Sequence, residues 1–133
     1  MTGLRILVTG SRRRRDRDTI RRALAETIAW WRGRGGTGPV TVIHGGAPGA
    51  DTEAHLAARA LGLHVEVHPS KWHEHVTAAG PLRDQQMIAT QPDICLAFPL
   101  GGPAVSPGTH QCIQACREHG IPVRIYPHGG GDH

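Results

Sequence analysis

A glycine-rich turn, HGGAPGAD, runs from His44 to Asp51 and carries residue types that bind phosphate in many α/β proteins. It follows the apolar run Val40–Ile43 and precedes a segment with helical character, Thr52–Leu61. Glycine lets the backbone come close to a ligand, and the free N–H groups of a first helical turn point at an anion. The turn therefore predicts a bound nucleotide or another phosphorylated ligand.

The same turn also has a simpler interpretation. It can be a tight strand-to-helix connection in which Asp51 stabilises the positive end of the helix dipole. It is not a Walker loop, because Ala50 and Asp51 stand where that pattern needs Lys and Ser or Thr. The predicted ligand-binding positions in this turn are Gly45, Gly46, Gly49, Ala50 and Asp51. Asp51 is the one whose side chain can accept a hydrogen bond from a ribose hydroxyl.

Two further segments offer groups for an anion. Gly10, Ser11 and Arg12 follow an apolar run, and a hydroxyl with a fixed cation there can bind phosphate oxygens. Gly108 and Thr109 place a hydroxyl at the expected start of a helix, which makes a second phosphate cradle. The alternatives are a turn serine with a solvent-facing arginine, and an ordinary threonine cap.

Arg83 and Met87 are one helical turn apart and face the same way. Taken alone, the pair is more typical of one surface arginine and one core methionine. Trp72 could stack on a base, although packing under its loop is the commoner role for such a residue. His73 and His75 are two apart in an irregular segment, which is a weak metal signal. We expect no metal and no cofactor.

Strand-like and helix-like segments alternate along the chain. Short apolar runs predict strands over residues 4–9, 40–44, 64–68, 93–99 and 121–126. Helical spacing, caps and terminal glycines predict helices from Asp16 or Asp18 to Arg32, and over residues 49–61, 81–90 and 108–119. The third strand alternates as an edge strand does, and Pro81 is expected at the first position of its helix.

This alternation predicts a Rossmann-like three-layer α/β sandwich, with a mostly parallel five-stranded sheet and helices on both faces. We expect residues 1–126 to form one domain and residues 127–133 to be a flexible tail. Ligands in such sheets bind beyond the carboxyl ends of the strands, where the strand order reverses. The loops at Gly10–Arg12, Gly45–Asp51 and Leu100–Thr109 all leave predicted strand ends. If those strands are neighbours, the loops converge on one crevice.

The chain has 133 residues and a formal net charge of +4. Much of the positive charge lies at Arg12–Arg15, Arg17, Arg21 and Arg22, which either attract polyanions or form a solvated loop and helix face. Aromatic residues make up 4% of the chain. That scarcity weakens an assignment to single-stranded nucleic acid, since such sites stack bases on aromatic rings.

The cysteines Cys95, Cys112 and Cys116 are expected to be buried free thiols in a reducing compartment, because their count is odd and Cys95 and Cys112 have apolar neighbours. No apolar stretch approaches the length of a membrane span. The N-terminal apolar run precedes the arginines, which is not the order of a signal peptide. We therefore expect a cytoplasmic protein with no membrane partner.

Five segments in this order, GSR, HGGAPGAD, AGPLRDQQM, DICLAFP and GT, resemble the SLOG superfamily, which joins the Smf/DprA proteins and the Lonely Guy enzymes. The chain looks like the small YspA/YpsA-related members, common in actinobacteria and their phages, over about residues 4–125. The resemblance implies a Rossmann-like fold that binds nucleotides or their derivatives. It places Gly45, Gly46 and Gly49 in the glycine turn, Arg83 and Met87 in an R-N/K-x-x-M element, and Gly108 and Thr109 in the second phosphate loop.

Two positions depart from the family pattern. Lonely Guy phosphoribohydrolases carry PGGxGTxxE, whose Glu acts in cleaving the N-glycosidic bond, and Cys112 stands at that position here. Asp84 replaces the Asn or Lys that usually follows the arginine. An enzyme would keep Arg83 and need another carboxylate from Asp51, Glu53 or Asp84. Asp51 is the best placed of the three, at the mouth of the expected crevice.

Three functions stay open. The first is a nucleotide-binding sensor or effector module, favoured by two phosphate loops and the missing Glu. The second is a nucleotide N-glycosidase or phosphoribohydrolase with Arg83 and Asp51 as catalytic residues. The third is nucleic-acid binding as in DprA-like proteins, supported by the arginine run. Relatives often form homodimers, and the outer face of the helix at residues 109–119 is the contact that the sequence offers.

Overall fold

The computed structural model describes residues 3–69 and 79–127, with the backbone alone at 79–83. Strands and helices alternate strictly within these ranges. The elements are β1 (Leu4–Gly10), α1 (Arg17–Gly33), β2 (Val40–His44), α2 (Ala50–Ala60), β3 (His64–Val67), α3 (Ala79–Ala89), β4 (Ile94–Phe98), α4 (Pro107–Glu118) and β5 (Val123–Ile125). The predicted alternation is confirmed.

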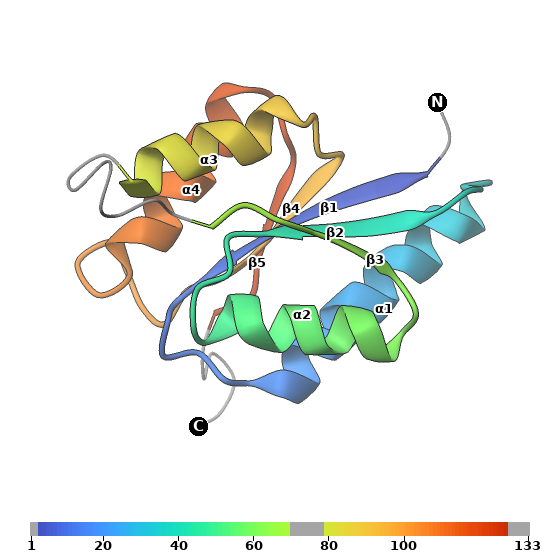
Figure 1. Ribbon diagram of the computed structural model, residues 1–133, viewed down its shortest axis with the longest axis horizontal. Helices are drawn as coiled ribbons and strands as arrows, with labels where there is room; N and C mark the ends of the chain where they lie inside the picture. The colour runs from blue at the N-terminus through green and yellow to red at the C-terminus, as the bar shows by residue number, and fades with distance from the viewer. Residues whose placement is uncertain (1–2, 70–78, 128–133) are drawn as a thin grey trace.

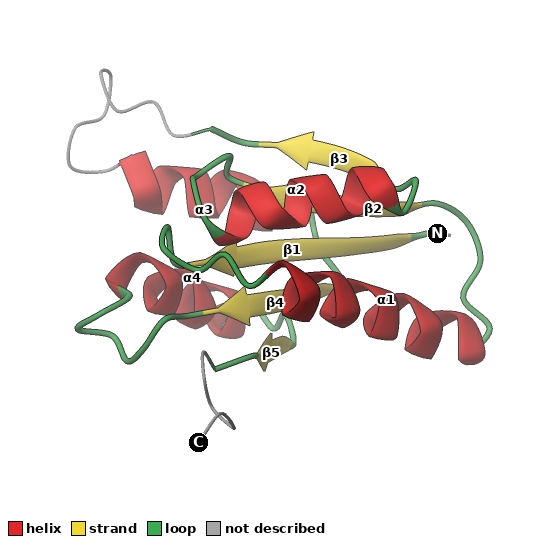
Figure 2. Ribbon diagram, turned by 90° about the horizontal axis from the view of Figure 1, so that it is seen from below, coloured by secondary structure: helices red, strands yellow, loops and turns green. Residues whose placement is uncertain are grey.

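The strands form one sheet in the order β3-β2-β1-β4-β5, and every pair in it is parallel. The order reverses between β1 and β4, because the chain moves outward from β1 to β3 and then crosses to the other side of β1. Figure 1 shows α3 and α4 on one face of the sheet, and Figure 2 shows α1 and α2 in front of the other face. The predicted three-layer sandwich is confirmed, with β3 at an edge.

Apolar layers fill the space on both sides of the sheet. In β1, Ile6 and Val8 pack in the layer beneath α1 and α2, whereas Leu7 packs in the layer beneath α3 and α4. A central parallel strand needs such continuous burial, because helices cover both of its faces. Small residues on α2, such as Ala54 and Ala58, let that helix lie close to the sheet. The core therefore holds the carboxyl ends of β1, β2 and β4 in fixed positions.

Two element ends differ from the prediction. α3 begins at Ala79, so that Pro81 is its third residue rather than its first. Proline is tolerated in a first turn, because those N–H groups have no acceptor within the helix. β5 is limited to Val123–Ile125, because the Ile121 N–H donates to Cys116 at the end of α4 and Pro122 has no N–H.

Candidate functional site

The loop after β1 contacts the ends of two other elements at the carboxyl edge of the sheet (Figure 2). The Ser11 N–H donates to the Phe98 carbonyl at the end of β4 (3.0 Å), and the Ser11 carbonyl accepts from the Ala50 N–H at the start of α2 (3.1 Å). The Ser11 hydroxyl oxygen accepts from the Arg13 N–H at 3.1 Å. Ser11 therefore joins three segments beside the point where the strand order reverses.

Two glycines allow the loop after β1 and the start of α2 to pack closely at this junction. At Gly49 φ is +79°, and a Cβ there would overlap the backbone carbonyls of Ser11 and Arg12. A Cβ at Gly10 would overlap the Cβ of Ala50. These two predicted site residues are thus needed for packing between loops of the protein itself, whatever they also offer a ligand.

Three N–H groups of the glycine turn, those of Gly45, Gly46 and Ala47, have partners inside the protein. Asp51 is 4% exposed, and its Oδ2 accepts from the N–H groups of Gly45 (3.0 Å) and Ala47 (3.3 Å). The Gly46 N–H donates to Nδ1 of His44 at 2.9 Å. The carboxylate of Asp51 lies where these donors would otherwise hold an external anion. Their hydrogen bonds explain how an acidic side chain can be buried here.

His44 is neutral because of its surroundings. Its ring is buried and meets that of His55 edge to face, with Nε2 2.9 Å from Nδ1 of His55. Since Nδ1 of His44 accepts from Gly46, its proton lies on Nε2 and is donated to His55. Burial, and then the neighbouring His55 and His68, lower the pKa of His44 to about 4. A neutral imidazole therefore holds the glycine turn at physiological pH.

The start of α4 leaves N–H groups available. Ser106 is the N-cap residue, and its hydroxyl oxygen accepts from the Leu100 N–H (2.9 Å) rather than from the helix. Pro107 has no N–H. The N–H groups of Gly108 and Thr109 have no partner within the part of the chain that the structure describes. This terminus resembles an empty anion site more than the start of α2 does.

The starts of α2 and α4 also differ in charge. The first turn of α2 carries Asp51 and Glu53, and Glu53 accepts from Nε of Arg17 at 2.8 Å. The first turn of α4 carries no acidic side chain. The positive end of the helix dipole is therefore already balanced in α2 and is unbalanced in α4. An incoming phosphate would be favoured at α4.

The arginine run is neither a uniformly solvated loop nor a continuous polyanion patch, because Arg14 is buried at 1% exposure. Its Nη1 donates to the carbonyls of Pro99 (2.9 Å) and Tyr126 (2.6 Å), and its Nη2 lies 3.2 Å from Asp16. Its guanidinium also lies 5.8 Å from the ring centre of Phe98. Arg14 ties the loop after β1 to the ends of β4 and β5, so it cannot contact an external polyanion.

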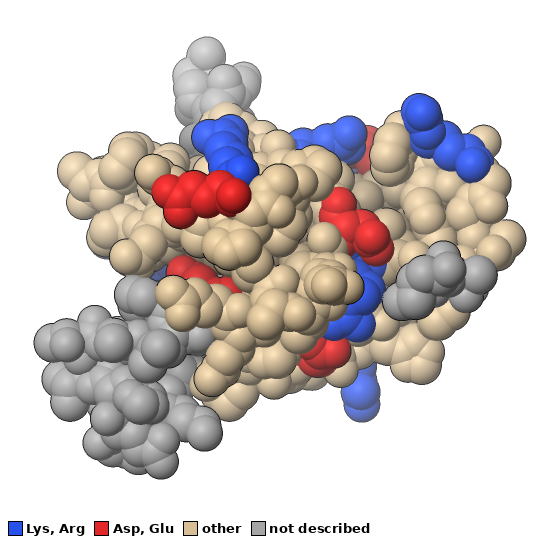
Figure 3. Space-filling view, turned by 90° about the horizontal axis from the view of Figure 1, so that it is seen from above, with Lys and Arg blue, Asp and Glu red and all other residues tan. Residues whose placement is uncertain are grey.

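The remaining arginines of that region are exposed on the loop after β1 and on α1, namely Arg12, Arg13, Arg15, Arg17, Arg21 and Arg22. Figure 3 shows the face that carries α3 and α4, where positive and negative side chains lie scattered over a mostly neutral surface. The basic excess seen in the sequence therefore belongs to the first loop and the first helix.

The family's R-N/K-x-x-M element lies on α3, which starts at the same edge of the sheet. The side chain of Arg83 lies outside the described part of the structure. The same part leaves out Trp72, His73, His75 and the tail from residue 128. Met87 is 2% exposed and packs with Ile88 in the apolar layer. Contact of Arg83 and Met87 with a ligand stays a prediction.

The cysteines are buried and free, as predicted. The pKa of the Cys112 thiol is raised far above its usual range, first by its hydrogen bond with Cys116, then by burial, and then by the negative charge of Asp84. Asp84 is 3% exposed and lies on α3 one turn before Met87. At the position of the Glu of the Lonely Guy enzymes the structure thus has a buried thiol that stays protonated, with a buried carboxylate from α3 near it.

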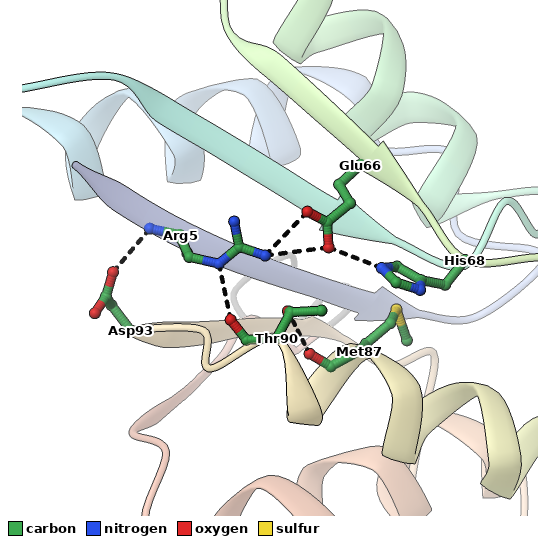
Figure 4. A network of polar contacts seen from close by, with 6 residues as sticks. All are labelled: Arg5, Glu66, His68, Met87, Thr90 and Asp93. Carbon is green, nitrogen blue, oxygen red and sulfur yellow. Dashed lines mark hydrogen bonds and ion pairs between the residues drawn. The ribbon is translucent and has the colours of Figure 1, made fainter. Parts of the chain in front are cut away.

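One polar network was not predicted from the sequence (Figure 4). Arg5 on β1 reaches Glu66 on β3, with Nη2 3.0 and 3.1 Å from the two carboxylate oxygens. Its Nε donates to the Thr90 carbonyl at 3.0 Å, and Oε2 of Glu66 lies 2.8 Å from Nε2 of His68. The alternation HVEVH was the available signal, since it places Glu66 and His68 on the same face.

The described residues contain no group of three or more His, Cys, Asp or Glu side chains that could hold a metal ion. None of the helices described is long and apolar enough to cross a membrane. A cavity of about 490 Å³ lies at the opposite, amino edge of the sheet, among Asp93, His119 and Ile121. It contains none of the predicted site residues, so the candidate site stays at the carboxyl edge.

Comparison with known proteins identifies the family of the chain. A family model described as "YspA, cpYpsA-related SLOG family" matches residues 4–75, which include β1, β2, β3 and the glycine turn. The Gene 61 protein of Mycobacterium phage D29 is 43% identical over 124 residues, covering 90% of this chain and 93% of that protein. No solved structure matches the chain. The chain therefore belongs to the YspA, cpYpsA-related SLOG family.

Proposed function

We propose that this protein binds a nucleotide or nucleotide derivative at the carboxyl edge of its sheet, as a sensor or effector module. The observation that carries the proposal is the junction at Ser11, which links the loop after β1 to the end of β4 and to the start of α2. Doubly wound sheets bind ligands at this place, where the strand order reverses. Membership of the SLOG family supports a nucleotide-related ligand.

The phosphate is assigned to the start of α4. Gly108 and Thr109 offer N–H groups there, and a Cβ at Gly108 would meet nothing within 4 Å, so the space above it is open. The exposed Arg12 adds a cation at the neighbouring loop. Asp51 and Glu53 disfavour a second anion at α2, where Asp51 is suited to accept from a ribose hydroxyl.

A pair of variants tests this assignment. Gly108→Asp places a carboxylate in the first turn of α4, where the helix dipole favours it but a bound phosphate would be repelled. Gln111→Asp adds the same charge to an exposed position in the same helix. Thermal stability is measured with AMP, GMP, ADP-ribose and inorganic phosphate. A nucleotide at about a hundred times its Kd should stabilise wild type and Q111D by roughly 2.7 kcal/mol.

G108D should be as stable as wild type without ligand and should lose the stabilisation by nucleotide. If G108D keeps that stabilisation, the phosphate lies elsewhere. If no nucleotide stabilises the wild-type protein, the proposed function is wrong.

One observation favours a second candidate, hydrolysis of an N-glycosidic bond. Asp84 on α3 lies near Cys112, which stands at the position of the catalytic Glu of the Lonely Guy enzymes. We therefore expect Asp84, rather than Asp51, to supply the carboxylate of any hydrolase. Release of free base from AMP is measured for wild type, D84N and D51N. Loss of release in D84N alone supports this candidate, and no release by wild type excludes it for AMP.

A further inference from the structure

The geometry points to His68 as a residue that contacts the nucleoside end of the ligand, through a hydrogen bond accepted by its Nδ1. This inference rests on the proposed function, because it concerns the other end of the same ligand. The group recognised would be a hydrogen-bond donor, either an exocyclic amino group of the base or a ribose hydroxyl. His68 belongs to none of the motifs that carry the family resemblance.

His68 lies at the right edge and on the right face. It is the first residue after β3, and its N–H donates to the carbonyl of His44, the first residue of the glycine turn (2.8 Å). Its ring lies on the side of the sheet that carries α3, above Met87 (Figure 4). Neighbouring strands are about 4.8 Å apart, so β3 lies roughly 14 Å from β4. That span is comparable with an extended mononucleotide, so a phosphate at α4 directs the nucleoside toward His68.

Glu66 fixes both the ring and its proton. The hydrogen bond from His68 lowers the pKa of Glu66, as does Arg5, against the opposing effect of burial. The carboxyl is therefore ionised, and an ionised carboxylate can only accept. In the neutral form of His68 the proton must then lie on Nε2, which leaves a lone pair on Nδ1. Nδ1 has no partner among the residues that the structure describes, and the His68 side chain is 21% exposed.

Support of the edge strand does not require His68. Arg5 already ties Glu66 on β3 to β1 and, through Thr90, to the end of α3. The additional bond from Glu66 to His68 orients an imidazole and determines which nitrogen carries the proton. Such orientation by a carboxylate is typical of histidines that act on a ligand.

Two substitutions separate ligand contact from structural support. In His68→Gln the amide nitrogen stands near the place of Nε2, so the bond to Glu66 is kept and the acceptor at Nδ1 is lost. In His68→Asn the amide oxygen stands near the place of Nδ1, and the side chain is too short to reach Glu66. Ligand contact predicts weaker binding for H68Q than for H68N. A purely structural role predicts normal binding by H68Q. It also predicts that H68N is less stable than H68Q, because only H68N loses the bond to Glu66.

Calorimetric titration of the full chain with AMP, IMP and 2′-deoxy-AMP provides the test. Loss of one neutral hydrogen bond corresponds to roughly five- to tenfold weaker binding. We expect that loss for AMP in H68Q and wild-type affinity in H119Q, whose exposed ring lies at the opposite edge of the sheet. If wild type binds IMP less tightly and H68Q weakens IMP no further, the amino group is the donor. If wild type instead binds 2′-deoxy-AMP less tightly and H68Q weakens that binding no further, the 2′-hydroxyl of the ribose is the donor.

The outcomes are distinguishable. Equal affinity of wild type and H68Q for AMP overturns the role of His68 and leaves the proposed function standing. Absence of binding by wild type to all three nucleotides overturns both. If H68Q does not fold, the ¹⁵N resonance of Nδ1 of His68 in wild type decides the question. A shift on saturation with AMP supports the contact, and an unchanged resonance overturns it.

Discussion

Asp51 is a buried carboxylate whose charge is stabilised by backbone N–H groups of its own loop. Asp51→Asn keeps an acceptor oxygen but removes the charge, so we expect a loss of about 1.5–3 kcal/mol in the free energy of unfolding. Urea unfolding at pH 7 measures this. Asp18→Asn is the control, since Asp18 is exposed in the first turn of α1. Equal stability of D51N and D18N would show that the glycine turn does not depend on the carboxylate.

His44 makes stability depend on pH. The unfolded chain takes up a proton near pH 6.5, whereas native His44 does so only at about 4. The unfolded state therefore binds more protons between these values, and stability falls as the pH is lowered from 6.5 to 4. The full difference corresponds to about 3 kcal/mol. His55 and His68 lie near His44 and contribute to its lowered pKa, so a variant is needed to isolate its part.

His44→Asn isolates that part, because its amide oxygen can still accept from the Gly46 N–H while no group titrates. Urea unfolding midpoints between pH 4 and 7 should change less with pH in H44N than in wild type. His119→Asn removes an exposed imidazole and should keep the wild-type dependence. A curve for H44N that parallels wild type would mean that native His44 titrates normally.

The elements at the site depend on how closely their loops pack. Gly49 and Gly62 both have positive φ, +79° and +73°. A Cβ at Gly49 would overlap the backbone of Ser11 and Arg12, whereas a Cβ at Gly62 would meet nothing within 4 Å. Gly62→Ala should therefore cost about 1 kcal/mol for its conformation alone. Gly49→Ala should cost about 3 kcal/mol or more, because backbone atoms must also move.

Urea unfolding of both variants measures the difference, which reports the docking of the β1 loop on the start of α2. A matched loss in the two variants would mean that the junction at Ser11 adjusts freely. Nucleotide binding by G49A, if the variant folds, should be weaker than by G62A, because the same junction positions the proposed site.

Elements were more predictable than the site because they are encoded locally. The run Val40–His44 is a strand in both the prediction and the structure, since its period and its flanking glycines suffice. Two features depend on contacts distant in sequence. Arg14 is buried by carbonyls of Pro99 and Tyr126, 85 and 112 residues away. The carboxylate that accepts from Arg5 is 61 residues away. No local pattern reports such partners.

At the scale of the whole molecule, the sheet has two parts that meet between β1 and β4. The family match covers the part with β1, β2 and β3, which holds the glycine turn and His68. The start of α4 and Arg83 lie in the other part of the chain. A ligand that spans the edge from α4 to β3 would therefore join both parts. Arg14 already does so within the protein, since it crosses from the loop after β1 to the ends of β4 and β5.

Buried and exposed positions of the arginine run should therefore respond differently to substitution. The buried arginine should matter for stability and the exposed arginines for polyanion binding. Arg14→Gln removes the two charge-assisted hydrogen bonds to the carbonyls of Pro99 and Tyr126. Their loss should cost about 3–6 kcal/mol, a large part of the roughly 5–15 kcal/mol typical of a domain. The double variant R13Q/R15Q changes exposed side chains and should stay within about 0.5 kcal/mol of wild type. Thermal unfolding measures both.

Elution from heparin by salt then tests the polyanion alternative. R13Q/R15Q should elute at lower salt than wild type, because each exposed arginine contributes to salt-dependent retention. R14Q, under conditions where it is folded, should elute with wild type, because the guanidinium of Arg14 is covered by carbonyls and by Phe98. If R13Q/R15Q also elutes with wild type, the exposed arginines of this run contribute nothing to polyanion binding, and the case for nucleic acid loses its main support.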